Sequence, residues 1–595
     1  MWCHLKLIIC DFEVFKYDTL FGCIVIDGNS QKLYQIWDIN DIKNFFECTY
    51  EDSIYINWNG KFYDNLVLEA ISKDKDSYKT SKAIINGEKI YSNLKFYHYD
   101  VMNTGYGEQI SLKLTELIAG KSIDTTEVDF DLDRPLTEEE KRLTEKYNQS
   151  DLYQTLYNFR ATYDRFELRL DIIKEWNLDL ADCLDMTGAQ IASTVLMAKK
   201  DVSLEYKKVP PKMYSNLIIE NQEVIDFYLN EEFRTSTKMK EITIGNAVLS
   251  LGAGGLHQAL KKVYYKRLLY LDVSGYYNLV MINYNLLSRA IPEEGKKRYA
   301  MMYDQQIALK KIDPSSPKRK SYKTILLAVF GAQGYKGSAM YDPEIGTLVP
   351  VTGELFLIDL MEKIYKYCIF VQTNTDGLML LPNSEEDEKK ILEILDNWLK
   401  RTNFVIKPKY IYNLFQRDVN NYIYQDEHGD VEVKGEALKN YDFSDKAYSA
   451  GTIFNCKEPA IIAKGIVNAL IYDKTPEETV EELKDDFRLF QYACKKGTFN
   501  YLTYDLINSD GSTSSMNVGP ICRAFAWNNK KCIGMVNKHK KGVAKDKVAK
   551  VASLPNSVFI YNRDLFTDEA KDFLEKNIDY DYYVERIYER IGEFI

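Results

Sequence analysis

Two apolar runs, each long enough for a buried strand, flank a polar turn that contains a single aspartate. The stretch is VQTNTDGLMLL, residues 371–381, and its turn carries Asp376 followed by Gly377. An Asp-Gly pair between apolar runs is typical of a β-hairpin. Because an unpaired charge at the tip of a core hairpin is costly, the chain must fold so that a cation or a set of donors meets Asp376.

A second strand-like run, KRLLYLD, also ends in an aspartate, Asp272. If the two strands are neighbours in one sheet, Asp272 and Asp376 lie close together and repel each other unless a cation lies between them. Magnesium prefers oxygen ligands and is usually held by one or two carboxylates together with substrate phosphates. Since two such ions can activate a hydroxyl and stabilise a leaving oxygen, this pair predicts a two-metal site for phosphoryl transfer.

A further set of acidic residues lies in the first quarter of the chain. Asp11 and Glu13 are two residues apart on a strand-like run, so both side chains point to the same face. Asp64 follows another strand-like run, and Tyr147 and Asp151 lie one helical turn apart. These residues predict a second two-metal site, in which the tyrosine orients an attacking water.

Composition narrows the class of protein. A chain of 595 residues is too long for one hydrophobic core and predicts several domains. The net charge of −11 argues against a protein that coats nucleic acid indiscriminately, but it allows a nucleic-acid enzyme with a basic channel. Residues 528–550 carry eight lysines and one acid, which is typical either of a solvated face or of a surface that binds phosphates.

The ten cysteines are scattered without a C-x-x-C pair, so we expect neither a zinc site nor disulfides. No apolar run approaches the length of a membrane span, and the first residues carry an acidic pair where a signal peptide needs a cleavage site. We therefore expect a cytosolic protein that does not enter membranes.

The order of local patterns predicts an α/β region first and helices later. Strand-like runs fill most of the first hundred residues, and a long helix begins after Thr137, where Glu140 completes a capping box. A Lys/Pro-rich passage at 207–215 looks like a connector. Helices are expected over 297–312 and 318–332, separated by the prolines of DPSSP, and from about Thr352.

The last quarter of the chain has the coarsest prediction. From about Asn440 onward we expect mainly helical, lysine-bearing structure. The terminal acidic segment, 566–594, predicts an amphipathic helix that either caps the fold or forms a partner surface, and the cap is the favoured interpretation.

Taken in order, these residues resemble six motifs of family B DNA polymerases, of the compact kind encoded by bacteriophages. The resemblance runs over most of the chain, and it implies a mixed α+β multidomain fold. An RNase H-like 3′-5′ exonuclease domain would be joined to a right-hand polymerase with palm, fingers and thumb. The stretches that carry it are DFE at 11–13, NGKFYD at 59–64, YNQSD at 147–151, LDVSGYYN at 271–278, KTILLAVFG at 323–331 and NTDG at 374–377.

The resemblance also implies a division of the chain into domains. Residues 1–195 would form the exonuclease domain, and 196–296 the connector with the first part of the palm. Residues 297–340 would form the fingers and 341–440 the second part of the palm. The thumb and C-terminal region would occupy 441–595.

Two active sites follow from the resemblance, each with two Mg²⁺ ions that Mn²⁺ can replace. Asp272 and Asp376 would be the metal ligands of the polymerase site. The metal ligands of the proofreading site would be Asp11, Glu13, Asp64 and Asp151, with Tyr147 placing the water.

Nucleotide binding is implied for residues around the predicted fingers. Lys323, Arg319 one turn earlier and Lys311 on the preceding helix would grip the triphosphate, because phosphate oxygens demand cationic donors. Tyr277 matches the residue that excludes a 2′-hydroxyl sterically. Phe330 stands where the family has tyrosine.

DNA contacts are implied for residues on both predicted domains. An aromatic ring such as that of Tyr63 can stack on a base of the frayed 3′ end. The GAGGLH segment, 252–257, resembles the link between the two domains, and the segment from NNYIY to VKG resembles the part of the palm that tracks the primer-template. The DNA-binding residues implied are Asn59, Tyr63, Ser111, Leu112, Gly254, Gly255, Gly331, Tyr422 and Lys434.

This sequence departs from the family pattern at several positions. Asn374 replaces the first aspartate of motif C, although Asp376 matches the indispensable one. The changes put fidelity and nucleotide affinity in question more than activity. The other departures are Gly252 for the tyrosine of the domain link, Gly275 and Asn278 in motif A, Leu327 and Phe330 in motif B, and Asn420 for the palm lysine.

Motif spacing bears on how synthesis begins. Only 51 residues separate Asp272 from Lys323, and 43 separate Gly331 from Asn374. Both intervals are short for the insertions that protein-primed phage polymerases carry there. We therefore expect extension from an ordinary primer, with protein priming as the alternative.

Three functions compete. The leading hypothesis is a monomeric DNA polymerase with proofreading that uses primer-template DNA, deoxynucleotides and magnesium in the host cytosol, alongside other replication proteins. The second is a 3′-5′ nuclease with a weakened polymerase site, and the third is a DNA-binding replication subunit without catalysis. The acidic residues of both sites favour the first.

Overall fold

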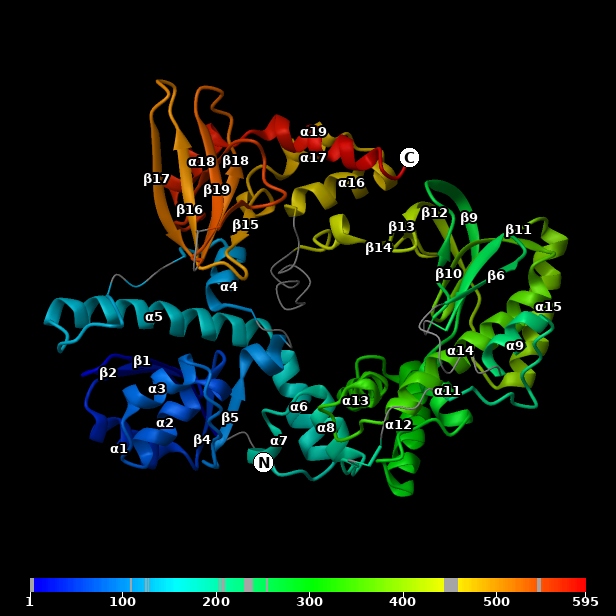
Figure 1. The fold of residues 1–595 in the computed structure, drawn as a ribbon, viewed down its shortest axis with the longest axis horizontal. Helices are drawn as coiled ribbons and strands as arrows, with labels where there is room; N and C mark the ends of the chain where they lie inside the picture. Colours follow the sequence, from blue (N-terminus) through cyan, green and yellow to red (C-terminus); the bar gives the residue numbers. More distant parts are fainter. Residues whose placement is uncertain are drawn as a thin grey trace. The chain divides into compact units, whose positions relative to one another are not determined.

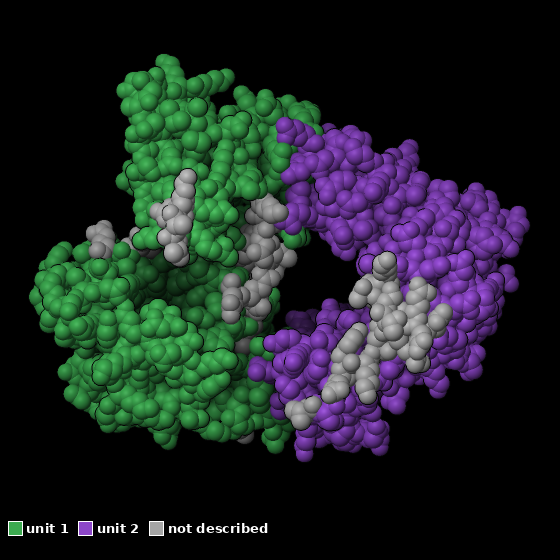
Figure 2. Space-filling view, in the orientation of Figure 1, with its two compact units in different colours: residues 1–187, 439–468, 474–588 green, residues 188–438, 469–473, 589–595 purple. Residues whose placement is uncertain are grey.

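The computed structural model describes residues 5–106, 110–123, 126, 128–201, 203–204, 209–229, 239–252, 255–443, 458–542 and 547–595. The chain divides into two compact units (Figure 2). Unit 1 comprises 1–187, 439–468 and 474–588, and unit 2 comprises 188–438, 469–473 and 589–595. The fold is a mixed α+β multidomain fold, as predicted. No helix among the described residues is long and apolar enough to cross a membrane.

Unit 1 begins with a five-stranded mixed sheet in the order β3-β2-β1-β4-β5. The strands β1, β2 and β3 form an antiparallel meander, and β4 and β5 add in parallel. β1 is buried along most of its length because α2, α3 and α5 all contact it. The bounds are β1 (Lys6–Val14), β2 (Thr19–Asp27), β3 (Ser30–Ile36), β4 (Ser53–Asn57), β5 (Tyr97–Asp100), α1 (Ile39–Thr49), α2 (Asp64–Ser72) and α3 (Ser77–Ile85).

The long helix predicted after Thr137 is confirmed as two consecutive helices. α5 (Glu138–Ala161, Figure 1) begins with the expected capping box between Thr137 and Glu140. α5 ends at Thr162, whose hydroxyl donates to the carbonyl of Asn158, and α6 (Tyr163–Glu175) follows at once. A short helix, α4 (Leu112–Ile118), packs on α5.

The prediction of mainly helical structure after Asn440 is wrong for residues 492–560. Two antiparallel sheets occupy this part of unit 1, in the orders β15-β18-β21 and β17-β16-β19-β20. The lysines there follow strand spacing, as at Lys538 and Lys540 on β19, which composition alone does not reveal. The bounds are β15 (Tyr492–Lys495), β16 (Tyr501–Ile507), β17 (Thr513–Gly519), β18 (Ile521–Ala526), β19 (Ile533–Lys540), β20 (Lys547–Lys550) and β21 (Val558–Ile560).

Helices precede and follow these sheets. The terminal acidic segment forms two helices, and α19 buries Tyr583 and Ile587. The Tyr583 hydroxyl donates to the carbonyl of Phe490 over 2.6 Å, which agrees with a cap rather than a free helix. The bounds are α16 (Ala460–Tyr472), α17 (Pro476–Leu483), α18 (Asp568–Asn577) and α19 (Tyr580–Ile591).

A fully buried arginine joins these sheets to the N-terminal part of unit 1. Arg523 lies on β18, and all five of its guanidinium N–H groups have acceptors. Burial lowers its pKa to about 9. One acceptor is the carbonyl of Leu117 in the last turn of α4, and another is the carbonyl of Lys121, three residues beyond that helix. The acceptors are Gln491 Oε1 and the carbonyls of Leu117, Lys121, Tyr561 and Arg563, at 2.8 to 3.2 Å.

Arg523→Met is expected to destabilise unit 1 by roughly 3–5 kcal/mol, because five acceptors lose their donor inside the protein. Chemical denaturation of the full chain measures this loss. Arg563→Met is the matched control, since the Arg563–Glu569 pair is exposed and contributes about 1 kcal/mol or less. Equal denaturation midpoints for Arg523→Met and Arg563→Met would contradict the assigned role of Arg523.

Unit 2 is built on a seven-stranded antiparallel sheet in the order β14-β13-β12-β9-β11-β10-β8. The predicted hairpin of residues 371–381 is confirmed as β10 and β11, and KRLLYLD is the end of β9. The bounds are β8 (Gln258–Ala259), β9 (Val263–Asp272), β10 (Cys368–Asn374), β11 (Gly377–Pro382), β12 (Lys409–Asp418), β13 (Asn421–Gln425) and β14 (Val431–Lys434), with a separate hairpin of β6 (Lys240–Ile244) and β7 (Ala247–Leu251).

Helices accompany this sheet within unit 2. The predicted break at DPSSP is confirmed between α12 and α13, and α14 begins nine residues before the expected Thr352. α8 packs on α13 and belongs to unit 2, although it lies inside the predicted range 1–195. The bounds are α8 (Gly188–Val195), α9 (Gln222–Leu229), α11 (Tyr276–Asn283), α12 (Glu293–Ile312), α13 (Pro317–Gly334), α14 (Pro343–Ile364) and α15 (Glu385–Thr402).

Candidate acidic sites

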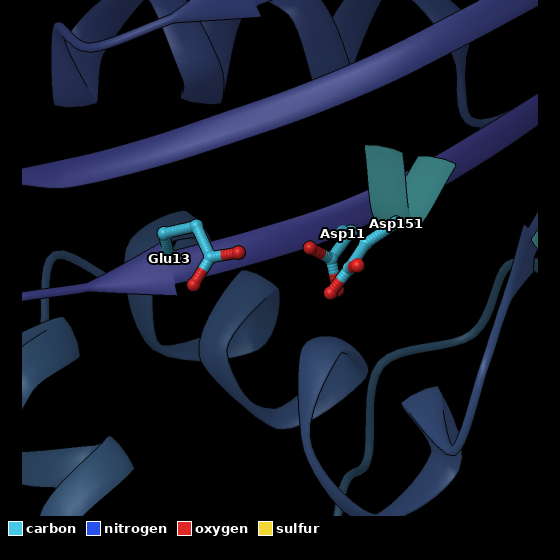
Figure 3. Close-up of side chains that lie close together, drawn as sticks. All are labelled: Asp11, Glu13 and Asp151. Carbon is cyan, nitrogen blue, oxygen red and sulfur yellow. The ribbon is translucent and has the colours of Figure 1, made fainter. Parts of the chain in front are cut away.

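The acidic site of unit 1 gathers carboxylates from β1 and α5. Asp11 and Glu13 project from the same face of β1, as their spacing predicts, and Asp151 projects from α5 toward them (Figure 3). One oxygen of each carboxylate lies within 4.8 Å of the others. Carboxylates this close repel each other unless protons or cations separate them, so the cluster has the chemistry of a metal site.

Asp64, the first residue of α2, lies beside this cluster, and its charge acts on Asp11 and Glu13. Its carboxylate accepts a hydrogen bond from the backbone N–H of Phe12, between Asp11 and Glu13, over 3.1 Å. Asn148, one helical turn before Asp151, donates to Asp11 Oδ2 over 2.9 Å. The structure therefore gathers three of the four acidic residues that the sequence assigned to this site, and it places the fourth, Asp64, beside them.

Burial and mutual repulsion disturb the titration of these carboxylates. Burial raises the pKa of Asp64 to about 7, against hydrogen bonds from the backbone N–H groups of Phe12 and Asp64. For Asp11, burial and then the charge of Glu13 raise the pKa well above its ordinary value. For Glu13, burial and then the charge of Asp151 do the same. A divalent cation would offset both effects.

Lys113 is a site residue that the sequence interpretation missed. Its ammonium donates to Asp151 Oδ1 over 2.5 Å and to Glu116 Oε1 over 3.0 Å, and it lies 4.5 Å from the ring centroid of Tyr147. Burial lowers its pKa, but the charges of Asp151 and Glu116 outweigh burial and raise it overall. A lysine two residues after the helix cap Ser111 was the available signal.

Asp100 is a second residue to which the sequence interpretation assigned no role. It is fully buried at the end of β5 and accepts hydrogen bonds from the backbone N–H groups of Asn59 and Lys61, over 3.1 and 3.3 Å. Asn59 adopts a left-handed conformation with φ of 64°. Asp100 thus holds the strained turn that leads into Asp64.

The residues predicted to bind the 3′ end surround this site, and their roles stay predictions. The hydroxyl of Tyr63 is paired with that of Ser81 at 2.8 Å, whereas the neighbouring Phe62 exposes 51% of its surface. Ser111 caps α4 by accepting from the N–H of Leu114 over 3.3 Å, and Leu112 begins that helix.

The acidic site of unit 2 lies where β9 meets the β10–β11 hairpin. Asp272 pairs with Gly377 across antiparallel strands, and the N–H of Val273 donates to the carbonyl of Asp376 over 2.8 Å. The sheet therefore places the two aspartates side by side, as the sequence predicted. Burial, followed by the charge of Asp272, raises the pKa of Asp376. Burial also raises the pKa of Asp272.

Several basic groups act on this pair of aspartates. The charges of Lys434 and His257 oppose the rise in the pKa of Asp376, and those of Lys409 and Lys310 oppose the rise for Asp272. The sequence singled out Lys434, but it assigned no role to the other three.

The predicted nucleotide-binding residues lie on α11, α12 and α13. Lys323 and Lys311 are exposed, while Arg319 donates to the carbonyl of Pro314 over 2.7 Å in the turn between the helices. The rings of Tyr277 and Phe330 are in contact, with centroids 4.4 Å apart.

The predicted DNA-binding residues of unit 2 fall into two groups. Tyr422 on β13 pairs across the strands with Lys434 on β14, whose ammonium lies 5.8 Å from the tyrosine ring centroid. Gly331 lies on the exposed side of α13, with nothing within 4 Å of a Cβ built there. A Cβ at Gly255 would lie 2.8 Å from the Thr375 hydroxyl, beside Asp376. Gly254 lies outside the described residues.

Comparison with known proteins assigns no family to this chain. No family model matches the sequence, and no curated protein matches it. Among solved structures, the chain is similar to the family B DNA polymerase from the hyperthermophilic archaeon Pyrobaculum calidifontis, with 12% sequence identity and a TM-score of 0.41. The match covers 99% of this chain and 78% of that one.

Proposed function

We propose that this protein is a template-directed DNA polymerase with a 3′-5′ proofreading exonuclease. The observation that carries the proposal is the presence of an acidic site in each compact unit, assembled from residues far apart in the sequence. One polymerising and one hydrolysing site would each require cations held by carboxylates. The reaction and the substrate, DNA, are inferred from the resemblance of the sequence motifs to those of family B DNA polymerases.

In the proposed polymerase site, Asp272 and Asp376 hold two Mg²⁺ ions, for which Mn²⁺ can substitute. Asp272 is partly buried and Asp376 is exposed, and two neighbouring carboxylates that repel each other and have raised pKa values fit such ions. When bound, the ions supply activation of the primer 3′-hydroxyl and stabilisation of the leaving pyrophosphate. Lys323, Arg319 and Lys311 bind the triphosphate of the incoming deoxynucleotide through charge-assisted hydrogen bonds.

Selection of the sugar is assigned to the aromatic pair on α11 and α13. The ring of Tyr277, supported by Phe330, would occupy the space that a 2′-hydroxyl needs and so reject ribonucleotides. Tyr422 and Lys434 contact the primer-template beside the acidic pair, with Gly255 and Gly331 allowing its backbone to approach.

In the proposed exonuclease site, Asp11, Glu13, Asp64 and Asp151 hold the metal ions. Tyr147 orients the attacking water, and the charge of Lys113 stabilises Asp151 in its ionised form. Asn59, Tyr63, Ser111 and Leu112 hold the single-stranded 3′ end. The RNase H-like character of the domain is part of this proposal.

A primer-extension assay separates the three hypotheses. A labelled primer on a longer template, with magnesium and the four deoxynucleotides, should grow; the same primer without nucleotides should shrink. Shrinkage without growth would favour the nuclease with a weakened polymerase site. Neither activity, with DNA still bound, would favour the non-catalytic subunit. Extension of an unmodified primer also tests the proposed priming mode against protein priming.

The biological setting is proposed from the motif resemblance. We assign the chain to replication of bacteriophage DNA in a host cytosol, as a monomer that works with other replication proteins. The described lysines of residues 528–550 lie on β19 and β20 and in the segments beside them, and Lys545 is outside the described residues. Both a solvated face and a phosphate-binding surface fit that arrangement.

Metal binding to unit 1 should depend on pH. The folded chain keeps a proton on Asp64 up to about pH 7, whereas an unfolded aspartate loses it near pH 4. Between these values the folded state binds more protons, so the stability of the metal-free protein should fall as the pH rises. Magnesium binds the ionised carboxylates, so it should raise the melting temperature by several degrees more at about pH 8 than at about pH 5.5.

Thermal unfolding with and without magnesium at both pH values measures this effect. Asp64→Asn removes one of the titrating carboxyl groups, so that variant should lose part of the pH dependence, whereas Asp27→Asn, which changes an exposed aspartate on β2, should keep all of it. An equal response to magnesium at both pH values in the unmodified protein would contradict metal binding by these carboxylates.

A further inference from the structure

Gly377 is required by a neighbouring side chain rather than by its own backbone. It is not among the glycines with positive φ, so its conformation is open to other residues. A Cβ built at Gly377 would lie 2.9 Å from Tyr270 Cε2 and 3.2 Å from the Tyr270 hydroxyl. Serine, which the motif resemblance would place here, has the same Cβ. The tyrosine ring therefore occupies the space that a side chain at 377 needs.

Tyr270 reaches this space from β9, two residues before Asp272 and on the same face of the sheet. Its hydroxyl lies 3.5 Å from Asp272 Oδ1, within reach of a hydrogen bond that small movements would shorten. The hydroxyl of Tyr270 therefore faces the carboxylate of a proposed metal ligand.

The ring of Tyr270 is held in place by its neighbours. It contacts Tyr424 edge-on, with centroids 6.4 Å apart, and Tyr424 stacks on Tyr422 with centroids 6.1 Å apart. The ammonium of Lys434 lies over Tyr422 at the far end of this row. The ring of Tyr270 therefore packs between Tyr424 and the backbone of Gly377, and this packing limits its rotation away from Asp272.

We propose that Tyr270 is a positioning residue for Asp272. Position 377 requires glycine because the Tyr270 ring fills the space that a side chain there would need. The ring fixes the hydroxyl, and the hydroxyl orients the carboxylate of Asp272, which together with Asp376 would hold the cation. This inference rests on the proposed polymerase function for its reaction, but the steric coupling of 270 and 377 does not depend on catalysis.

A double-mutant cycle tests the coupling. Gly377→Ala should lower the rate of primer extension about 30-fold, because the new methyl group displaces the ring and with it the hydroxyl. Tyr270→Leu removes the ring atoms in question and should cost about 10-fold. In the Tyr270→Leu background, Gly377→Ala should cost less than about 2-fold further, since of the close neighbours only the Leu271 carbonyl remains, 3.3 Å from the new methyl group.

Tyr270→Phe tests the hydroxyl separately. The ring stays, so the phenylalanine variant should fold and pack normally, but it should need several times more magnesium for half-maximal extension. At saturating magnesium its rate should approach that of the unmodified protein. Loss of packing alone would not produce a shift confined to magnesium dependence. Gly188→Ala, where a Cβ meets nothing within 4 Å, and Tyr335→Leu, whose ring is exposed, are the matched controls.

A binding measurement keeps the inference testable if the unmodified protein does not extend primers, an outcome that would by itself refute the proposed polymerase function. Titration of Mn²⁺ by calorimetry, in a chain whose unit 1 site is disabled by Asp11→Asn, reports the affinity of the Asp272–Asp376 pair. Gly377→Ala and Tyr270→Phe should each weaken it several-fold. Multiplicative losses in the cycle, or unchanged magnesium and Mn²⁺ dependence in Tyr270→Phe, would overturn the inference.

Discussion

Asp376→Asn is expected to abolish primer extension while 3′-5′ degradation of the same primer continues. The substitution removes one of the two carboxylates that the β9, β10 and β11 strands bring together. Loss of one ligand should cost several kcal/mol of transition-state stabilisation, which corresponds to roughly 1,000-fold or more in rate. Single-turnover extension with saturating nucleotide, followed on a gel, measures it.

The control for this variant is Asp396→Asn, which removes an exposed acid of α15 that pairs with Lys400. It should leave both activities unchanged. Asp272→Asn should repeat the result of Asp376→Asn, because both carboxylates serve one site. If Asp376→Asn extended primers at the normal rate, the assignment of the unit 2 site would be wrong.

Asp11→Asn should give the opposite pattern, with degradation of the primer lost and extension retained. Asp11 lies in the oxygen cluster with Glu13 and Asp151, so its loss should lower the nuclease rate by roughly 1,000-fold or more. Degradation of a labelled single strand with magnesium and without nucleotides measures the change. With all four nucleotides present, the variant should also leave more mismatched primer ends extended.

Asp27→Asn is the matched control, since this aspartate is exposed on β2 of the same sheet. It should degrade DNA at the normal rate. Glu13→Gln should behave like Asp11→Asn. Equal nuclease activity in Asp11→Asn and Asp27→Asn would refute the unit 1 site, whatever the outcome for polymerisation.

Local sequence patterns predicted the parts of both sites that depend on neighbours along the chain. Two-residue spacing placed Asp11 and Glu13 on one face of β1, and the Thr137–Glu140 pair marked the start of α5. The Asp-Gly pair at 376–377 identified the hairpin. Strand alternation, capping and turn chemistry act over a few residues, so they can be read from the sequence.

Residues whose importance comes from distant partners were missed. Lys113 meets Asp151, and Asp100 holds the turn at Asn59. Arg523 donates to the carbonyl of Leu117 in α4, which lies 406 positions away in the sequence. The strands of residues 492–560 were also missed, because a lysine-rich composition hides the two-residue period.

The sequence by itself determined which carboxylates exist, on which local elements they lie and which face each one takes. Only the tertiary structure decided which of these carboxylates meet, and which basic side chains and tyrosines lie beside them. The physical reason is that backbone pairing and turn chemistry are set by adjacent residues. The burial that raises the pKa of Asp64 and the contact between Tyr270 and Gly377 arise only when separate strands and helices pack.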